Sequence, residues 1–89
     1  MPAKLSAAKR QRQNSARRLR NRTVRSRMRT AIRSFVDSLD GDRSEAVERL
    51  GHAVRAVDKA ASKGVVHRRT AARYKRRLAG RLRRRFAAT

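Results

Sequence analysis

The basic residues of this chain are concentrated at its two ends. Residues 1–36 carry twelve lysines and arginines and no acid, and residues 59–89 again carry twelve basic residues and no acid. All six acids lie between Asp37 and Asp58, and the formal net charge is +21. Charge of one sign at this density repels itself and favours association with a polyanion. The chain must therefore fold around a small core and keep two basic segments available to a partner.

Length and composition limit that core to a single small domain. The 89 residues are 38% apolar and include three aromatics, one Tyr and two Phe. This suits a thin core between helices and is too little for a sandwich or a ligand-enclosing barrel. The absence of cysteine excludes disulfides and thiolate metal sites. No apolar run approaches the ~20 residues of a membrane span, so we expect an intracellular protein with no membrane partner. An organellar transit peptide is a weaker reading of the Arg- and Ser-rich start, because that start leads directly into a core-forming helix.

Apolar residues recur at steps of three and four in three segments, which predicts helices near residues 5–39, 43–62 and 68–86. No alternating β-branched run indicates a strand. The predicted core residues are Val24, Met28, Ala31, Ile32, Phe35, Val36 and Leu39 in the first helix, Ala46, Val47, Leu50, Ala53, Val54, Val57, Ala60 and Ala61 in the second, and Ala71, Tyr74, Leu78, Leu82 and Phe86 in the third.

Turn residues separate the predicted helices. Asp42 is expected to cap the second helix, with Glu45 as its capping-box partner. Gly64 is expected to end that helix in the left-handed conformation. The short connections imply antiparallel neighbours. The end of the third helix would then return toward Asp37–Asp42, where Arg83–Arg85 could form ion pairs that serve the fold.

The predicted fold class is all-α: a three-helix bundle with a long N-terminal helix extending beyond the bundle. We expect one domain, 1–89, with a basic N-terminal overhang at 1–20 and the bundle at 21–86. The second helix is long enough to cover the first only back to about Arg20. Like charges at i,i+4 destabilise an isolated helix, so the overhang is expected to be disordered or frayed without its partner.

Two surfaces are candidates for contact with a polyanion. Opposite Ile32, the first helix presents the hydroxyl residues Thr23, Ser26, Thr30 and Ser34, flanked by Arg20, Arg27 and Arg33. Short hydroxyl side chains let a phosphate approach, and guanidinium groups can bind it bidentately. The third helix presents Arg69, Arg73, Arg76 and Arg83 opposite Leu78. Gly80 lies among these arginines, either to admit an RNA backbone or as a neutral substitution at an exposed site.

Nothing in the sequence predicts an enzyme, and we expect no cofactor or metal. There is no nucleophile with a matching base and no glycine-rich phosphate loop. His52 is expected on the surface, and His67 is placed to cap the third helix or touch a phosphate. Tyr74 falls on the apolar side of its helix, where core packing is favoured over base stacking.

RNA is favoured over DNA as the polyanion. Basic residues surround the helix over residues 9–22, which suits burial among several phosphate backbones better than insertion into one groove. If about ten of these bases neutralise phosphates, log K should fall with log salt at a slope of about −7 to −9. A nucleoid-type DNA-compacting protein remains the main alternative. A membrane-active amphipathic peptide is a third, weakened by the scarcity of aromatic residues.

Two stretches, AKRQRQNSARRLRNRTVRSRMRTAIR (8–33) and DKAASKGVVHRRTAARYKRRLA (58–79), resemble bacterial ribosomal protein S20. The resemblance implies a structural component of the small (30S) ribosomal subunit, located in the cytoplasm in the ribosome. It implies direct binding to the 5′ and 3′ minor domains of 16S rRNA, neutralisation of phosphates and clamping of rRNA helices during assembly. It implies only peripheral contact with other small-subunit proteins and no homo-oligomer.

The resemblance assigns RNA contact to Lys9, Arg10, Arg18, Asn21, Arg22, Ser26, Thr30, Lys63, His67, Arg68 and Arg73. With the residues inferred from charge and helical position, the expected rRNA-binding set also includes Arg12, Arg17, Arg20, Thr23, Arg27, Arg69, Arg76 and Arg77. The family commonly has Asn at the position of Arg69 and Ser at that of Arg76. The first change removes a helix cap, for which His67 or Thr70 is expected to substitute.

Overall fold

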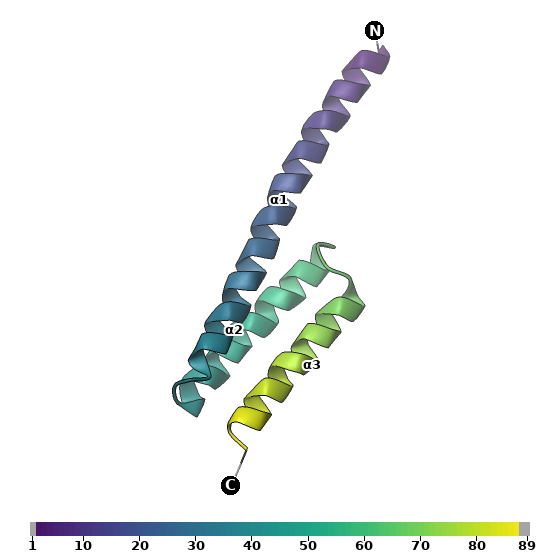
Figure 1. The fold of residues 1–89 in the computed structure, drawn as a ribbon. Helices are drawn as coiled ribbons and strands as arrows, with labels where there is room; N and C mark the ends of the chain where they lie inside the picture. Colours follow the sequence, from purple (N-terminus) through teal and green to yellow (C-terminus); the bar gives the residue numbers. More distant parts are fainter. Residues whose placement is uncertain (1, 88–89) are drawn as a thin grey trace.

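The computed structural model of the chain describes residues 2–87, with side chains described from residue 6, and this part consists of three α-helices joined by short turns (Figure 1). The helices are α1 (Pro2–Ser38), α2 (Arg43–Ser62) and α3 (Arg68–Arg85). The predicted all-α fold is confirmed. The first helix begins at Pro2 and not near residue 5, because a proline at the first helical position loses no helical hydrogen bond. Met1, Ala88 and Thr89 of the predicted domain lie outside the described residues.

The predicted caps at both ends of α2 are present. The Asp42 carboxylate accepts a hydrogen bond from the Glu45 backbone N–H at 2.8 Å. Gly64 has a φ of 73°, the left-handed conformation that a residue with a Cβ rarely adopts. Each turn is thus specified by a residue within a few positions of it, and the two turns make consecutive helices antiparallel neighbours.

The middle helix separates the other two. α2 packs against both α1 and α3, whereas no Cα atom of α1 lies within 8 Å of one in α3 among the described residues (Figure 1). Ala46, Ala53 and Ala60 recur every seven residues along α2 and are completely buried. Their methyl groups let two helices approach α2 closely. The bundle is consequently open along the side where α1 and α3 face each other.

The core forms two apolar clusters, one at each end of the bundle. Nearer the overhang, Val24, Met28, Val57, Ala60 and Ala71 are buried together. Nearer the α1–α2 turn, Phe35, Leu39, Ala46, Ala53 and Leu78 are buried together. All ten residues belong to the predicted core.

The prediction was wrong for one residue of the core. Val47 is 47% exposed. It follows Ala46 directly, and one residue along a helix turns the side chain by about 100°, which carries Val47 off the buried face.

The N-terminal half of α1 extends alone into solvent (Figure 1). Residues 6–20 are all exposed, including Leu19 at 66%. The expected disorder of this overhang is not what the structure shows: the helix continues to Pro2, because its backbone hydrogen bonds are internal and need no neighbouring element. The radius of gyration is 18.0 Å, against about 12 Å for a compact chain of this length. The longest dimension is 72 Å.

Contacts between α1 and the end of α2 begin near Arg20. An Nη atom of Arg20 donates to the backbone carbonyl of Lys63, just beyond the end of α2, at 3.5 Å. Val24, one turn further along α1, is the first buried residue of that helix. A guanidinium at a helix C-terminus also faces the negative end of the helix dipole. Arg20 is thus the first α1 residue that hydrogen-bonds to the segment after α2 among the contacts of the described residues.

Candidate nucleic-acid interface

Five arginines form one line along α1, at steps of three and four residues. These residues, named here the arginine stripe, are Arg18, Arg22, Arg25, Arg29 and Arg33. Together with Asn21, Ser26 and Thr30 they line a groove of about 800 Å³. Such spacing places successive guanidiniums along one side of a helix, about a turn apart. The arrangement presents a row of planar cations that can each bind phosphate bidentately.

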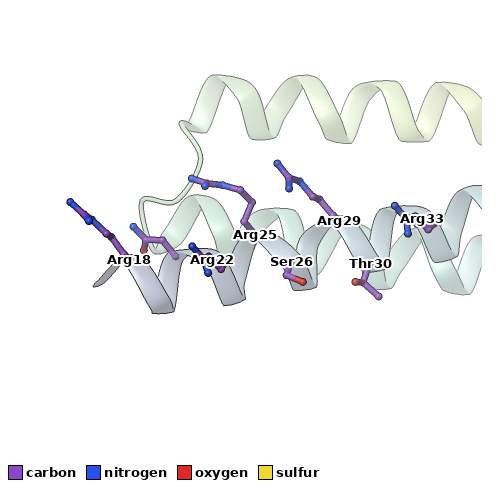
Figure 2. Close-up of a pocket in the computed structure, with 8 residues that line it drawn as sticks. Arg18, Arg22, Arg25, Ser26, Arg29, Thr30 and Arg33 are labelled. Atoms are coloured by element: carbon purple, nitrogen blue, oxygen red, sulfur yellow. The ribbon is translucent and has the colours of Figure 1, made fainter. Parts of the chain in front are cut away.

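The side chains around the stripe point in two directions. Figure 2 shows Arg25 and Arg29 extending from α1 toward α3, with Ser26 and Thr30 on the opposite side. The two hydroxyl residues also border a second groove, of about 340 Å³, between α1 and α2. That groove is completed by Arg27, Ala31, Ser34, Arg49 and His52. Ser26 and Thr30 thus lie between two cationic surfaces.

Almost none of this charge is neutralised within the protein. Among the side chains of residues 6–87, one ion pair lies within 4.0 Å. It joins Lys75 of α3 to Asp58 of α2 at 2.8 Å. Both groups are exposed, so the pair contributes at most about 1 kcal/mol. The stripe therefore carries a concentrated and uncompensated positive charge.

The expected ion pairs between Arg83–Arg85 and Asp37–Asp42 do not form. Two of the arginines have other partners on their own helix. The guanidinium of Arg85 lies 4.7 Å from the centre of the Phe86 ring, a cation–π contact. The guanidinium of Arg84 folds back over Gly80. Both side chains thus have local contacts in place of an acidic partner.

The structure brings five of the predicted site residues together on α1. Arg18, Asn21, Arg22, Ser26 and Thr30 line the same groove. All are exposed except Asn21, which is half-buried.

One of the predicted hydroxyl residues already uses its hydroxyl group within α1. Thr23 is exposed, but its hydroxyl donates to the Leu19 carbonyl at 3.0 Å. The hydroxyl hydrogen of Thr23 is thus used within α1, so Thr23 presents no free donor to a phosphate.

The other predicted α1 residues lie outside that groove. Lys9, Arg10, Arg12 and Arg17 are exposed on the overhang, and Arg12 borders a shallow depression with Ala8, Gln11 and Ser15. Arg20 contacts the end of α2, and Arg27 borders the groove between α1 and α2. Lys63 is exposed directly after α2. The predicted residues thus surround α1 and do not form one pocket.

The predicted residues of α3 form a separate surface. Arg68, Arg69, Arg73, Arg76 and Arg77 are all exposed on a helix that α2 holds apart from α1. The sequence indicated a basic face here but not its separation from the arginine stripe. Two cationic helices, one on each side of α2, can therefore meet different segments of a partner.

Sequence reasoning missed three residues of the stripe as sites: Arg25, Arg29 and Arg33 line the groove with the predicted residues. Arg33 was considered only as a residue flanking the hydroxyl face, and Arg25 and Arg29 were not among the candidates. The signal was present in the spacing, because the five arginines repeat at steps of 4, 3, 4 and 4. Helical periodicity of charged residues was as informative as that of apolar ones.

Gly80 is on the outer face of α3, as predicted, but it is not exposed. It is buried, and a Cβ built there would lie 3.1 Å from Nη1 of Arg84. The covering atom is the far end of a flexible side chain, which can swing away. In the free protein, the space that a side chain at position 80 would occupy is used by the guanidinium of Arg84.

Replacing Gly80 with alanine tests whether an RNA backbone approaches there. Gly80→Ala should stabilise the free protein by up to about 1 kcal/mol in urea unfolding, because alanine favours the helix. Close approach predicts weaker rRNA binding despite that gain. Gly51→Ala is the matched control, since Gly51 is also helical with an arginine four residues later, and its new Cβ would be 3.7 Å from Arg55. Equal RNA affinity of both variants would show that Gly80 is not a point of close approach.

His67 caps α3, as the sequence predicted. Its Nδ1 accepts a hydrogen bond from the Arg69 backbone N–H at 3.1 Å, and its φ and ψ of −70° and 147° are extended. The imidazole therefore takes the role of the asparagine that the resemblance led us to expect at position 69. Because Nδ1 accepts here, the outward-facing N–H available to a phosphate is that on Nε2.

Two substitutions separate capping by His67 from RNA contact. His67→Asn keeps a favourable cap, so the free energy of unfolding should change by less than about 0.5 kcal/mol, whereas His67→Ala should lose about 0.5–2 kcal/mol. Thermal unfolding followed by circular dichroism measures both. If His67 also binds a phosphate, the two variants lose rRNA affinity alike. Full affinity of His67→Asn would limit this residue to capping.

The fold and the grooves define a class: a small, helical, strongly basic protein in which most of the described cationic side chains are exposed and have no acidic partner. Within the described residues no helix has an apolar stretch long enough to cross a bilayer.

Comparison with known proteins identifies the family. Residues 2–83 match the sequence model described as Ribosomal protein S20. The small ribosomal subunit protein bS20 of Nocardia farcinica is 53% identical over 75 residues, 83% of this chain and 87% of its own length. That of Bacillus licheniformis is 46% identical over 82 residues, 89% and 91% of the two chains. That of Desulfitobacterium hafniense is 46% identical over 87 residues, 98% and 97%.

The chain therefore belongs to the ribosomal protein S20 family. It is a structural component of the small subunit of the cytoplasmic ribosome and not an enzyme. The expected family, its cellular location and its non-enzymatic nature are confirmed.

Proposed function

We propose that the protein binds 16S rRNA directly and holds rRNA helices together while the small subunit assembles. The observation that carries this is the arginine stripe, whose five guanidiniums line one groove without an acidic partner. Phosphate oxygens supply the missing negative charge and accept hydrogen bonds from the planar guanidinium groups. Clamping follows from α2, which keeps the basic faces of α1 and α3 apart. RNA segments bound to the two faces are thereby held at a fixed spacing.

The two basic helices are proposed to contact the 5′ domain and the 3′ minor domain of 16S rRNA. The whole chain acts as one RNA-binding domain, with residues 1–20 as the overhang and residues 21–86 as the bundle. Other small-subunit proteins contact it only peripherally, and it does not form a homo-oligomer. The proposed contact residues are the predicted set together with Arg25, Arg29 and Arg33.

Competition binding tests the proposal. Full-length protein is mixed with 16S rRNA and excess double-stranded DNA at near-physiological salt, and the retained nucleic acid is identified. Selective retention of 16S rRNA supports the proposal. Indifference between the two nucleic acids would favour a DNA-compacting role. Crosslinking in cells, followed by sequencing of the attached RNA, then reports whether the 5′ and 3′ minor domains are the segments bound.

RNA binding is expected to raise the helix content of the protein. Residues 6–20 form an exposed helical overhang with a high density of positive charge, and repulsion between these charges should fray its end in solution until phosphates neutralise them. Circular dichroism at 222 nm, where RNA contributes little, should show a stronger helical signal in the complex than in the sum of its parts. An unchanged signal would mean that the overhang is already fully helical on its own.

A further inference from the structure

A third groove opens between α1 and α3, and its walls differ in chemistry. Its volume is about 410 Å³. Three guanidiniums of the arginine stripe line one wall, apolar side chains of α1 form the base, and the loop before α3 and the aromatic residue of α3 form the other wall. The guanidiniums belong to Arg25, Arg29 and Arg33. Met28 and Ile32 form the base, and Val66 and Tyr74 form the other wall. We refer to this space as the α1–α3 groove.

The groove exists because α2 keeps its two neighbours apart. No Cα of α1 approaches within 8 Å of α3 in the described helices, so side chains alone define the space between them. Tyr74 is half-buried and packs against the apolar cluster around Met28 and Val57. The core thus supports the tyrosine without covering it completely. Figure 2 shows Arg25 and Arg29 pointing from α1 toward α3.

The lining is complementary to a nucleotide and not to a phosphate alone. A phosphate needs cations and hydrogen-bond donors, which the three arginines provide. An apolar base with an aromatic wall adds nothing to phosphate binding, but it suits the flat face of a nucleobase, which stacks on aromatic side chains. The volume is within the range of about 300–1,000 Å³ that is typical of sites for small ligands. Within a double helix the faces of the bases are covered by the neighbouring base pairs, so a base that stacks here must come from an unpaired nucleotide.

We propose that the α1–α3 groove binds one unpaired nucleotide of the rRNA, with its base against the Tyr74 ring and its phosphate on Arg29 and Arg33. This inference rests on the proposed function and adds a specific contact to it. Neutralising phosphates alone does not distinguish one RNA segment from another. A groove that accepts an extruded base favours sites with a bulge or loop beside a helix, and so gives the basic surface a preference within the rRNA.

The chain contains its own probe for this contact. Tyr74 is its one tyrosine, and it has no tryptophan. Tyrosine emission of the full-length protein therefore reports on this position. Titration with a 16S rRNA fragment, corrected for RNA absorbance, should quench the emission by more than half. Inorganic polyphosphate, which has phosphates but no bases, should bind the arginines and leave the emission within about 10% of its starting value. Equal quenching by both polyanions would overturn the proposal.

Two variants of Tyr74 give an independent measurement. Tyr74→Phe keeps the ring and should bind 16S rRNA within about twofold of the unmodified protein. Tyr74→Leu keeps an apolar side chain but removes the ring, and should weaken binding by between about fivefold and 100-fold. Its salt slope should not change, because no phosphate contact is lost. Circular dichroism of each variant establishes that the bundle is intact.

The failure of this inference can be told apart from failure of the proposed function. If the unmodified protein selects 16S rRNA over DNA, but its tyrosine emission is unaffected and Tyr74→Leu binds normally, the groove does not hold a base and the rRNA-binding role stands. If the unmodified protein shows no preference for 16S rRNA, the proposed function itself fails, and the nucleotide site fails with it.

Discussion

Replacing Arg22, Arg25 and Arg29 with glutamine should weaken 16S rRNA binding by about 100-fold at near-physiological salt. Each of these guanidiniums lines the groove on α1, and each lost phosphate contact removes about 1 kcal/mol or more. Each contact also accounts for about 0.7–0.9 of the slope of log K against log salt, so the slope should become shallower by about two to three. Fluorescence anisotropy with labelled rRNA at several potassium chloride concentrations measures both quantities. Glutamine keeps the helix propensity, so the fold should be preserved.

A second triple variant controls for net charge. Arg43, Arg55 and Arg81 are exposed, and none of them lines the grooves described above. Changing these three to glutamine lowers the net charge by the same amount as the first variant. Its salt slope should remain within about one of the original. Equal losses from the two variants would mean that total charge, and not the arginine stripe, determines binding.

Phe35→Ala should leave much of the free protein unfolded at 25 °C. Phe35 is completely buried between the helices and is one of the largest side chains enclosed in the core. Truncating a buried phenylalanine costs about 3–5 kcal/mol, and a domain this small has only about that much stability. Urea unfolding followed at 222 nm should show either a strongly lowered midpoint or no folded baseline. Added 16S rRNA should restore part of the helical signal, because a ligand that binds only the folded state stabilises it.

Exposed apolar residues of the same helices provide the controls. Leu19→Ala removes a large apolar side chain from α1, and Val47→Ala removes one from α2, at positions 66% and 47% exposed. Each should change the free energy of unfolding by less than about 0.5 kcal/mol, since no cavity forms. Val57→Ala, at a completely buried position of α2, should cost about 2 kcal/mol. Similar losses at Val47 and Val57 would contradict the orientation of α2.

The helices, their turns and most of the core could be predicted because the signals for them are local. The Asp42 cap and the left-handed Gly64 act within a few residues, and the apolar stripes repeat with the period of the helix. Val47 was assigned to the core because it lies three residues before Leu50, at a helical step. The structure buries the face of α2 that contains the adjacent Ala46. Which face is buried depends on where α1 and α3 pack, and the local sequence does not specify this.

The candidate site was predicted less completely, because it depends on tertiary arrangement and side-chain conformation. The spacing of the arginines in α1 was readable, yet Arg25 and Arg29 gain their significance from a space between two helices that α2 holds apart. Arg84 covers Gly80, and Arg85 stacks on Phe86, although both arginines had acidic residues as alternative partners. Long flexible side chains choose among several nearby contacts, and helical position alone does not determine that choice.

Ala46, Ala53 and Ala60 act as spacers whose size sets the distance between the two basic helices. Each is completely buried on α2, in the clusters where α1 and α3 meet it. A longer side chain at any of them would push a flanking helix outward and change the separation of the cationic surfaces without altering a single charge. Three buried methyl groups would thus set the spacing that the proposed RNA partner must match in order to reach both helices.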